Sequence, residues 1–163
     1  MPKAKTSRQK PSSALAFVEQ SAVIPYRKKK KGLEILLVTS LDTGRWVIPK
    51  GHIDEGLTAR ESAIKEAYEE AGVKGVTARQ ALGAYRYVKD VKKGGGLRRV
   101  KVFAMEVIVA LDDWPERAKR KRKWMSVNDA AKAVKEKKLS KILESFATTI
   151  PKRDDPPGSA EQG

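Results

Sequence analysis

The stretch that decides the fold reads GHIDEGLTARESAIKEAYEEAGV and covers residues 51–73. Its second half predicts a helix over 58–71. Thr58 is a favourable N-cap, and Glu61, three residues later, completes a capping box. Gly72 supplies the left-handed residue that commonly ends a helix. We therefore expect a well-defined helix at the centre of the chain, preceded by a polar loop.

The helix carries a trio of glutamates, Glu66, Glu69 and Glu70, at positions i, i+3 and i+4. In an α-helix this spacing places the carboxylates within about 100° of one another around the axis. Like charges at this spacing repel, and the C-terminal half of a helix disfavours anions. A hard divalent cation such as Mg²⁺ would offset that repulsion. The simpler interpretation is a solvated acidic face, which is the usual meaning of such a pattern.

The residues before the helix favour the metal interpretation. Trp46, Val47 and Ile48 predict a short strand that Pro49 ends, and a loop over 52–57 leads to the helix. Gly51 allows the backbone to approach a metal or a phosphate closely. Lys50 can face the same phosphate charge.

The rest of the chain predicts a mixed sheet flanked by helices, an α+β arrangement. The expected strands cover 17–26, 33–40, 76–88, 97–111 and 121–127, and the expected helices cover 128–137 and 139–147, with Ser126 or Asn128 as a cap. The first two strands form a hairpin with a basic tip, and a glycine loop at 94–96 joins 76–88 to 97–111. We expect a basic tail over 1–16, one folded domain over 17–150 and a second tail over 151–163.

Composition narrows the class of protein. The 163 residues include 35 Lys and Arg against 20 Asp and Glu, a formal net charge of +15 that favours phosphate-rich partners. The chain has no Cys and one His, His52, which excludes disulfide scaffolds, thiol nucleophiles and two-histidine zinc motifs. No apolar run approaches the roughly 20 residues that span a bilayer, so we expect a cytoplasmic protein with no membrane partner.

The 51–73 stretch resembles the Nudix box, G-x5-E-x7-R-E-U-x-E-E-x-G-U, where U is aliphatic. Gly51, Gly72, Val73 and the glutamate trio stand at their box positions. Leu57 replaces the first box Glu, and Lys65 replaces the box Arg. The family's two side chains commonly pair, so losing both together leaves no unpaired buried charge.

The resemblance covers about residues 17–146. The run 69–75, the stretch from Leu111 to Trp114 and the run from Arg120 to Trp124 are similar to the diphosphoinositol polyphosphate phosphohydrolase branch, as is 40–49. The P-K-G-H sequence from Pro49 to His52 is closer to Nudix enzymes that act on diadenosine polyphosphates.

The resemblance implies a Nudix-type α/β/α sandwich that hydrolyses a phosphoanhydride bond with Mg²⁺, or alternatively Mn²⁺. It implies Gly51, Glu66, Glu69 and Glu70 as metal ligands, with Glu69 or Glu70 also holding the attacking water. Lys50 joins the glutamates as a candidate catalytic residue. Glu106, the acid within 97–111, is an alternative general base, although an outward-facing strand residue is the simpler interpretation.

Basic residues outside the box are candidates for binding substrate phosphates. Arginine can grip a phosphate with two parallel hydrogen bonds. The candidate substrate-binding residues are Arg45, Arg98, Arg99, Arg27 and Ser40. Trp46 and Trp124 could stack on a base, but packing in their short apolar runs is the simpler explanation.

The sequence is compatible with two functions. The first is hydrolysis of a polyanion such as a dinucleoside polyphosphate or a diphosphoinositol polyphosphate, by a monomer or homodimer. The second is a Nudix-fold module of low activity that binds RNA or another polyanion through its basic surface, with nucleic acid as the partner.

Overall fold

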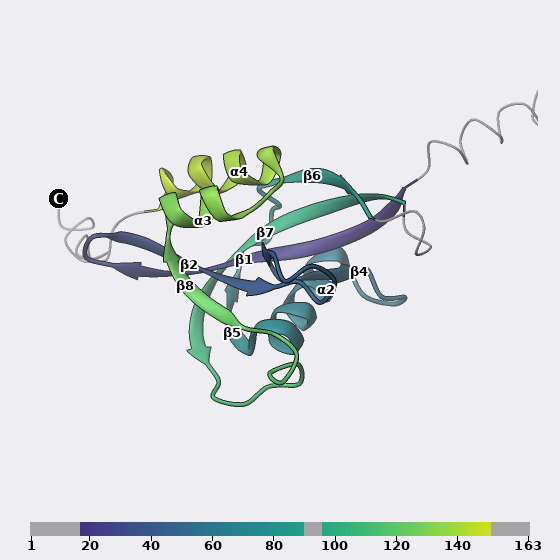
Figure 1. Ribbon diagram of the computed structural model, residues 1–163, viewed down its shortest axis with the longest axis horizontal. Coiled ribbons are helices and arrows are strands. Elements are labelled where there is room, and N and C mark those ends of the chain that lie inside the picture. Colours follow the sequence, from purple (N-terminus) through teal and green to yellow (C-terminus); the bar gives the residue numbers. More distant parts are fainter. Residues whose placement is uncertain (1–16, 90–95, 151–163) are drawn as a thin grey trace, which may run out of the picture.

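A computed structural model of the chain describes residues 17–89 and 96–150 (Figure 1). The strands are β1 (Val18–Lys29), β2 (Gly32–Thr39), β3 (Trp46–Val47), β4 (Lys50–His52), β5 (Val73–Thr77), β6 (Gly83–Val88), β7 (Leu97–Ala110) and β8 (Arg122–Ser126). The helices are α2 (Ala59–Glu66), continued by a π-helical turn (Ala67–Ala71), α3 (Val127–Ala133) and α4 (Lys137–Ala147).

The strands form one mixed sheet, as predicted, and the structure gives the strand order β3-β2-β1-β7-β5. β1 runs parallel to β7, with Val18 opposite Arg98, and antiparallel to β2. Three further strands extend the sheet off this path: β4 pairs with β1, β6 with β7 and β8 with β2. β1 therefore lies at the centre and joins the glycine-containing strand β4 to the rest of the fold.

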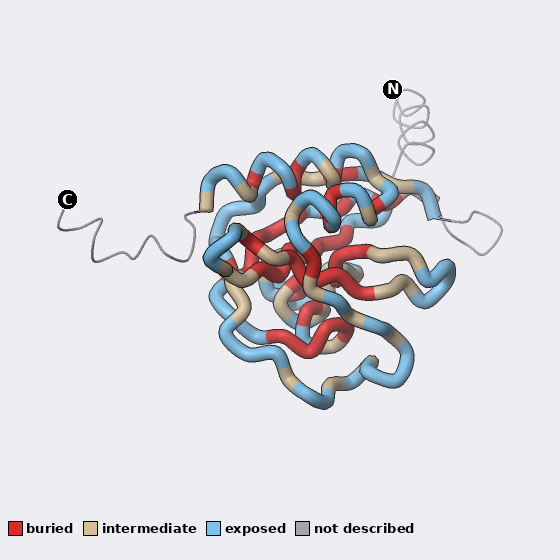
Figure 2. Tube along the Cα trace, turned by 60° about the vertical axis from the view of Figure 1, so that its left-hand side comes forward, coloured by how far each residue is buried: buried red, intermediate tan, exposed pale blue. Residues whose placement is uncertain are grey.

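Helices cover both faces of the sheet, which confirms the sandwich. Alternate residues of β1 point to opposite faces, because side chains alternate along a strand. Ile24 packs in the cluster under α3 and α4, whereas Val23 packs with Ala63 and Ala67 of the central helix. Figure 2 shows the buried strands as the inner layer and the exposed helix faces outside.

The basic-tipped hairpin and the last strand agree with the predictions, but one strand does not. The predicted strand over 76–88 covers the end of β5, a break, and the whole of β6, and both strands pair antiparallel with β7. Alternating apolar residues continue through the connection, so the periodicity hid the break. His52, predicted as the first residue of the loop, instead forms β4 together with Lys50 and Gly51, and β4 pairs with β1.

Two predictions fall on residues that the structure does not describe. The tails over 1–16 and 151–163 lie wholly outside the described residues, and so do Gly94 and Gly95 of the predicted glycine loop. Within the part of the chain that the structure describes, no helix has the length and apolar character needed to cross a membrane.

Candidate active site

We call α2 and the π-helical turn that continues it, residues 59–71, the glutamate helix. Its start agrees with the sequence prediction. The Thr58 hydroxyl accepts a hydrogen bond from the Glu61 backbone N–H at 3.0 Å, and the Glu61 carboxylate accepts one from the Thr58 N–H at 2.9 Å. The backbone N–H of Asp54 donates to the Ser62 hydroxyl at 3.0 Å. The loop is thereby tied to the first turns of the helix.

The end of the helix differs from the prediction of regular α-helix to Ala71. Residues 67–71 form a π-helical turn, and the N–H of Gly72 reaches back to the carbonyl of Ala67 as well as to that of Tyr68. Gly72 has φ 68°, the predicted left-handed residue. Glu69 and Glu70 thus stand on a widened turn of a kind found often at functional sites, and an angle calculated for an α-helix does not apply to them.

Glu66 lies directly against Gly51. A Cβ atom at residue 51 would overlap the Glu66 carboxyl group, so only glycine permits this approach. Burial raises the pKa of Glu66 to about 8, and the charges of Glu70 and Glu69 and a hydrogen bond with Glu70 add to the rise. Crowded carboxylates of this kind mark functional sites, because their repulsion is relieved when a cation binds.

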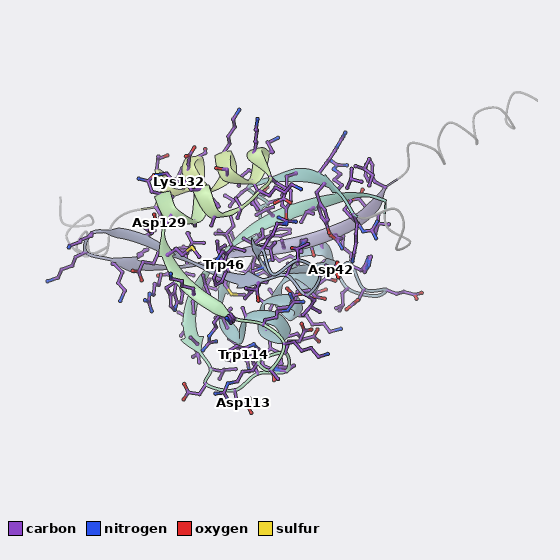
Figure 3. All side chains as sticks on the ribbon, viewed as in Figure 1. Asp42, Trp46, Asp113, Trp114, Asp129 and Lys132 are labelled. Carbon is purple, nitrogen blue, oxygen red and sulfur yellow. The ribbon has the colours of Figure 1, made fainter. Side chains whose placement is uncertain are left out.

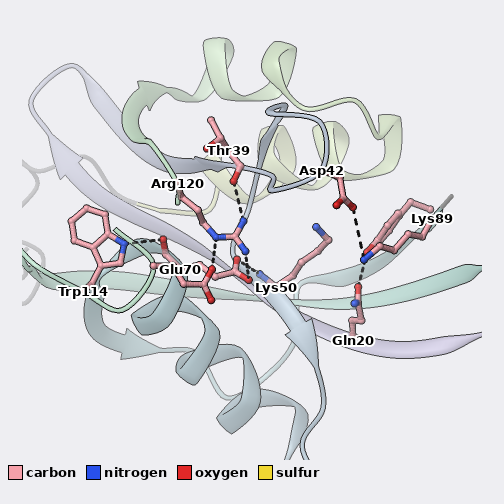
Figure 4. A network of polar contacts seen from close by, with 10 residues as sticks. Gln20, Thr39, Asp42, Lys50, Glu70, Lys89, Trp114 and Arg120 are labelled. Atoms are coloured by element: carbon pink, nitrogen blue, oxygen red, sulfur yellow. Dashed lines mark hydrogen bonds and ion pairs between the residues drawn. The ribbon is translucent and has the colours of Figure 1, made fainter. Parts of the chain in front are cut away.

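Glu70 is almost completely buried, with 6% of its surface exposed, and it is held from two sides (Figure 4). Its carboxylate accepts a hydrogen bond from the Lys50 backbone N–H at 3.2 Å and lies 3.2 Å from the Arg120 guanidinium. Arg120 is itself fixed by Glu116 at 2.7 Å and by the Thr39 carbonyl at 2.9 Å. Burial raises the pKa of Glu70, and the charge of Arg120 opposes that rise.

The residues present fit a magnesium ion. Glu66 and Glu70 are adjacent carboxylates beside the half-buried backbone of Gly51, and Mg²⁺ typically takes one or two carboxylates, water and substrate phosphate rather than a cage made wholly of protein. Glu69 stands apart, with its carboxylate 4.0 Å from Lys65. Accordingly, no group of three acidic or histidine side chains within residues 17–89 and 96–150 is gathered closely enough to hold an ion alone.

A cleft of ≈ 680 Å³ opens next to these glutamates. Cationic and acidic side chains both line it, among them Asp42 of the loop after β2, which Figure 3 labels. The polar and charged residues that line it are Gln20, Ser40, Asp42, Thr43, Arg45, Lys50, His52, Asp54, Glu66, Glu70, Lys89, Arg120 and Lys135.

Among the predicted substrate-binding residues, Ser40 and Arg45 line this cleft. Ser40 shares a hydrogen bond with Thr43 at 2.7 Å, which shapes the loop after β2. Arg45 lies 3.7 Å from Glu136. Lys50, the predicted catalytic lysine, also lines the cleft, where its ammonium lies 5.2 Å from the centre of the Tyr87 ring, and burial lowers the pKa of Lys50.

The structure does not bring the other predicted residues to the cleft. Arg98 is buried on β7, opposite Tyr87 of β6, and its Nε has no hydrogen-bond partner in the described part of the chain. Arg99 lies 3.9 Å from Glu19 on the outside of the sheet. Arg27 pairs with Glu34 at 2.6 Å.

Two further candidates are also placed by contacts outside the cleft. Glu106, the alternative base, lies 4.0 Å from Lys28 near the basic hairpin. Trp124 carries the Arg27 guanidinium at 4.1 Å from its ring centre, so this indole is a packing surface.

Several residues of the site were not singled out from the sequence. Arg120 was seen only as part of a basic run, Tyr87 and Gln20 only as strand residues, and Lys89 was not considered. The Tyr87 hydroxyl donates to Gln20 at 2.9 Å across the cleft wall. The one available signal was the placement of Arg120 in the run that resembles the diphosphoinositol polyphosphate phosphohydrolase branch.

Comparison with known proteins gives consistent matches. A family profile described as the NUDIX domain matches residues 18–146. The chain is 34% identical over 145 residues to Nudix hydrolase 12, mitochondrial, of Arabidopsis thaliana, covering 77% of this chain and 70% of that protein. It is 32% identical over 120 residues to the human diphosphoinositol polyphosphate phosphohydrolase 3-alpha, covering 72% of this chain and 70% of that one. A crystal structure of the C. elegans Ap4A hydrolase has a similar fold, with TM-score 0.61 and 22% identity over 83% of this chain and all (100%) of that chain.

Proposed function

The chain belongs to the Nudix family and is a Nudix hydrolase, and from that premise we propose that it cleaves a phosphoanhydride bond in a polyanionic substrate with the help of Mg²⁺. Dinucleoside polyphosphates and diphosphoinositol polyphosphates are the two substrate classes proposed. The observation that carries the proposal is the juxtaposition of Glu66 and Glu70, beside Gly51, with a cleft that Arg45, Lys50 and Lys89 also line.

The acidic end of the cleft is suited to a divalent cation. Glu66 and Glu70 would hold Mg²⁺, with the Gly51 carbonyl and Glu69 as further oxygen ligands carried over from the family pattern. When bound, the ion would neutralise phosphate charge and activate the attacking water. Mn²⁺ is the alternative ion, because both prefer oxygen ligands.

The protein's own cations are suited to orient the phosphate chain. Lys50 projects into the cleft above Tyr87, within reach of a phosphate that also approaches Glu66 and Glu70. Arg45 and Lys89 also line the cleft and would bind phosphates beyond the scissile bond. Phosphoryl transfer depends mainly on such positioning and charge neutralisation, and little covalent chemistry is required of the protein.

Two facts support the pair of substrate classes. The human relative is named for diphosphoinositol polyphosphates, and the worm enzyme of similar fold is named an Ap4A hydrolase. A cleft of ≈ 680 Å³ with several cations can take a chain of phosphates together with a ring-sized group. The volume does not favour an inositol ring over a nucleoside.

A substrate panel tests the proposal. Adenosine polyphosphates and diphosphoinositol phosphates are incubated with the protein, with and without Mg²⁺ or Mn²⁺, and the products are identified. We expect metal-dependent cleavage of one class and its loss in Glu70→Gln, by about 100-fold or more, as for removal of a transition-state interaction. Absence of turnover in the whole panel, with tight salt-dependent RNA binding retained by Glu70→Gln, would instead favour the polyanion-binding module.

A further inference from the structure

The segment 111–122, which consists of the connection between β7 and β8 and the first residue of β8, crosses the end of the glutamate helix. Helices leave their last carbonyl groups without intrahelical donors. Here the backbone N–H of Glu116 donates to the Glu69 carbonyl at 3.0 Å, and the N–H of Leu111 donates to the Gly72 carbonyl at 2.8 Å. We call residues 111–122 the capping segment.

Two side chains of the capping segment satisfy the carbonyls in between. The Trp114 indole Nε1 donates to the Glu70 carbonyl at 3.1 Å (Figure 4). The Arg122 guanidinium donates to the Ala71 carbonyl at 2.7 Å and to the Leu111 carbonyl. Four successive carbonyls, from residue 69 to residue 72, thus each have a donor from one distant segment.

Trp114 and Arg122 also pack as a unit on the helix end. The Arg122 guanidinium lies 3.8 Å from the centre of the Trp114 ring. The ring also lies against Gly72, where a Cβ atom would come within 2.6 Å of the indole. The packing fixes the direction of the indole N–H, so the hydrogen bond to Glu70 has a single geometry.

The same segment holds the Glu70 side chain as well as its backbone. Glu116 donates its N–H to the Glu69 carbonyl, and its carboxylate fixes Arg120, which pairs with the Glu70 carboxylate at 3.2 Å. The last carbonyl groups of a helix lack intrahelical donors, so outside donors have more influence on the orientation of these peptide groups. A rotation of the Glu70 peptide would turn its carboxylate away from Glu66.

We propose that Trp114 and Arg122 are positioning residues, which fix the π-helical turn so that Glu70 presents its carboxylate to the divalent cation. The inference rests on the proposed function, since it assigns this carboxylate to the metal. Partners behind a metal ligand typically affect metal affinity or activity by about 10- to 100-fold.

The test uses Trp114→Phe in the full chain. Phenylalanine keeps a ring between Gly72 and Arg122 but removes the donor to Glu70. Mn²⁺ binding without substrate is measured by electron paramagnetic resonance of the free ion, together with kcat and KM. We expect Mn²⁺ affinity and kcat to fall about tenfold, with KM changed less than threefold.

Trp124→Phe is the matched control. Trp124 lies on β8 close to the capping segment and packs beneath Arg27, with no hydrogen bond from its indole in the described residues. We expect this variant to lose thermal stability but to bind Mn²⁺ as the unchanged protein does. If Trp114→Phe behaves the same way, losing stability alone, the positioning role is wrong.

Arg122→Lys provides a second, independent variant. Lysine keeps the positive charge near Trp114. It lacks the planar guanidinium that donates to the Ala71 and Leu111 carbonyls at the same time. We expect weaker Mn²⁺ binding here too, and unchanged binding would contradict the inference. If the unaltered protein hydrolyses a substrate of the panel and both variants bind Mn²⁺ and turn over as it does, only the positioning role is wrong. If the unaltered protein neither binds Mn²⁺ nor hydrolyses any substrate, the proposed function is wrong as well.

Discussion

The ammonium of Lys65 lies 2.8 Å from a carboxylate oxygen of Asp54. Lys65 stands where the Nudix box has Arg, and the box Glu that would face it is replaced by Leu57. Asp54, three residues before Leu57, supplies a carboxylate from the same loop. The loop-to-helix ion pair is therefore present in this chain with a different acidic partner, and the loop is held despite the two departures from the box.

Asp54→Asn is expected to slow turnover by about two- to fivefold and to change the free energy of unfolding by less than ~1 kcal/mol, because both side chains are substantially exposed. Leu57→Glu in the Asp54→Asn background should restore turnover. Leu57 is exposed, and a glutamate there stands at the position of the Nudix box whose carboxylate would pair with Lys65. Steady-state rates and urea denaturation of the two variants and the unchanged protein measure both effects. Failure of Leu57→Glu to restore activity would show that the box position cannot substitute for Asp54.

Arg120→Ala is expected to destabilise the fold strongly. Arg120 and Glu70 have side chains only 9% and 8% exposed, and removing one member of a buried pair leaves the other charge without compensation. Such losses cost about 3–5 kcal/mol. The control is Arg117→Ala, since Arg117 is exposed and its contact with Asp113 at 3.9 Å should contribute less than ~0.5 kcal/mol. Comparable unfolding free energies for the two variants, measured by urea denaturation, would contradict the buried pair.

The stability of the metal-free protein should fall as pH rises. The pKa of Glu66 is about 8 in the folded chain against an ordinary value of 4.5, so between these values the folded state holds a proton that the unfolded state has released. Unfolding is then increasingly favoured with rising pH, and the stability contributed by the proton on Glu66 is lost by about pH 8.

Glu66→Gln isolates that contribution, because glutamine fills the same space and does not titrate. In urea denaturation with a chelator, the variant should gain stability relative to the unchanged protein as pH goes from about 5 to about 8. Added Mn²⁺ should reduce the difference at high pH, since the ion stabilises the ionised carboxylate of the unchanged protein alone. A constant difference across this pH range would contradict the raised pKa.

Local signals in the sequence were sufficient for the start of the glutamate helix and for its exit. Thr58, Glu61 and Gly72 act through bonds to residues nearby in the chain, so their roles follow from spacing. The mixed sheet was also predictable, because runs of apolar residues mark its strands. The break between β5 and β6 was missed, since apolar alternation carries no information about where a chain turns.

The features missed at the site all depend on contacts between distant segments. Arg120 meets Glu70 across 50 residues of sequence, and Trp114 meets the Glu70 carbonyl across 44. The carbonyls at the end of the π-helical turn likewise accept hydrogen bonds from 111–122, and the local sequence of 67–71 does not predict these contacts. Arg27 and Arg99 illustrate the reverse case, because their basic character suggested phosphate binding while the sheet register places acids, Glu34 and Glu19, beside them.

Gly51→Ala should separate activity from stability. A Cβ atom at residue 51 would overlap the end of the Glu66 side chain, which is flexible and can swing away at small energetic cost. The carboxylate would then leave its position beside Glu70, so kcat and Mn²⁺ affinity should fall by about tenfold or more while the melting temperature changes by only a few degrees. Gly83→Ala is the matched control, because its added methyl group would lie 3.5 Å from Ile142, an ordinary contact, and should leave activity unchanged. Full activity in Gly51→Ala, measured with the preferred substrate of the panel, would mean that the close approach of Glu66 to the backbone is not needed for the reaction.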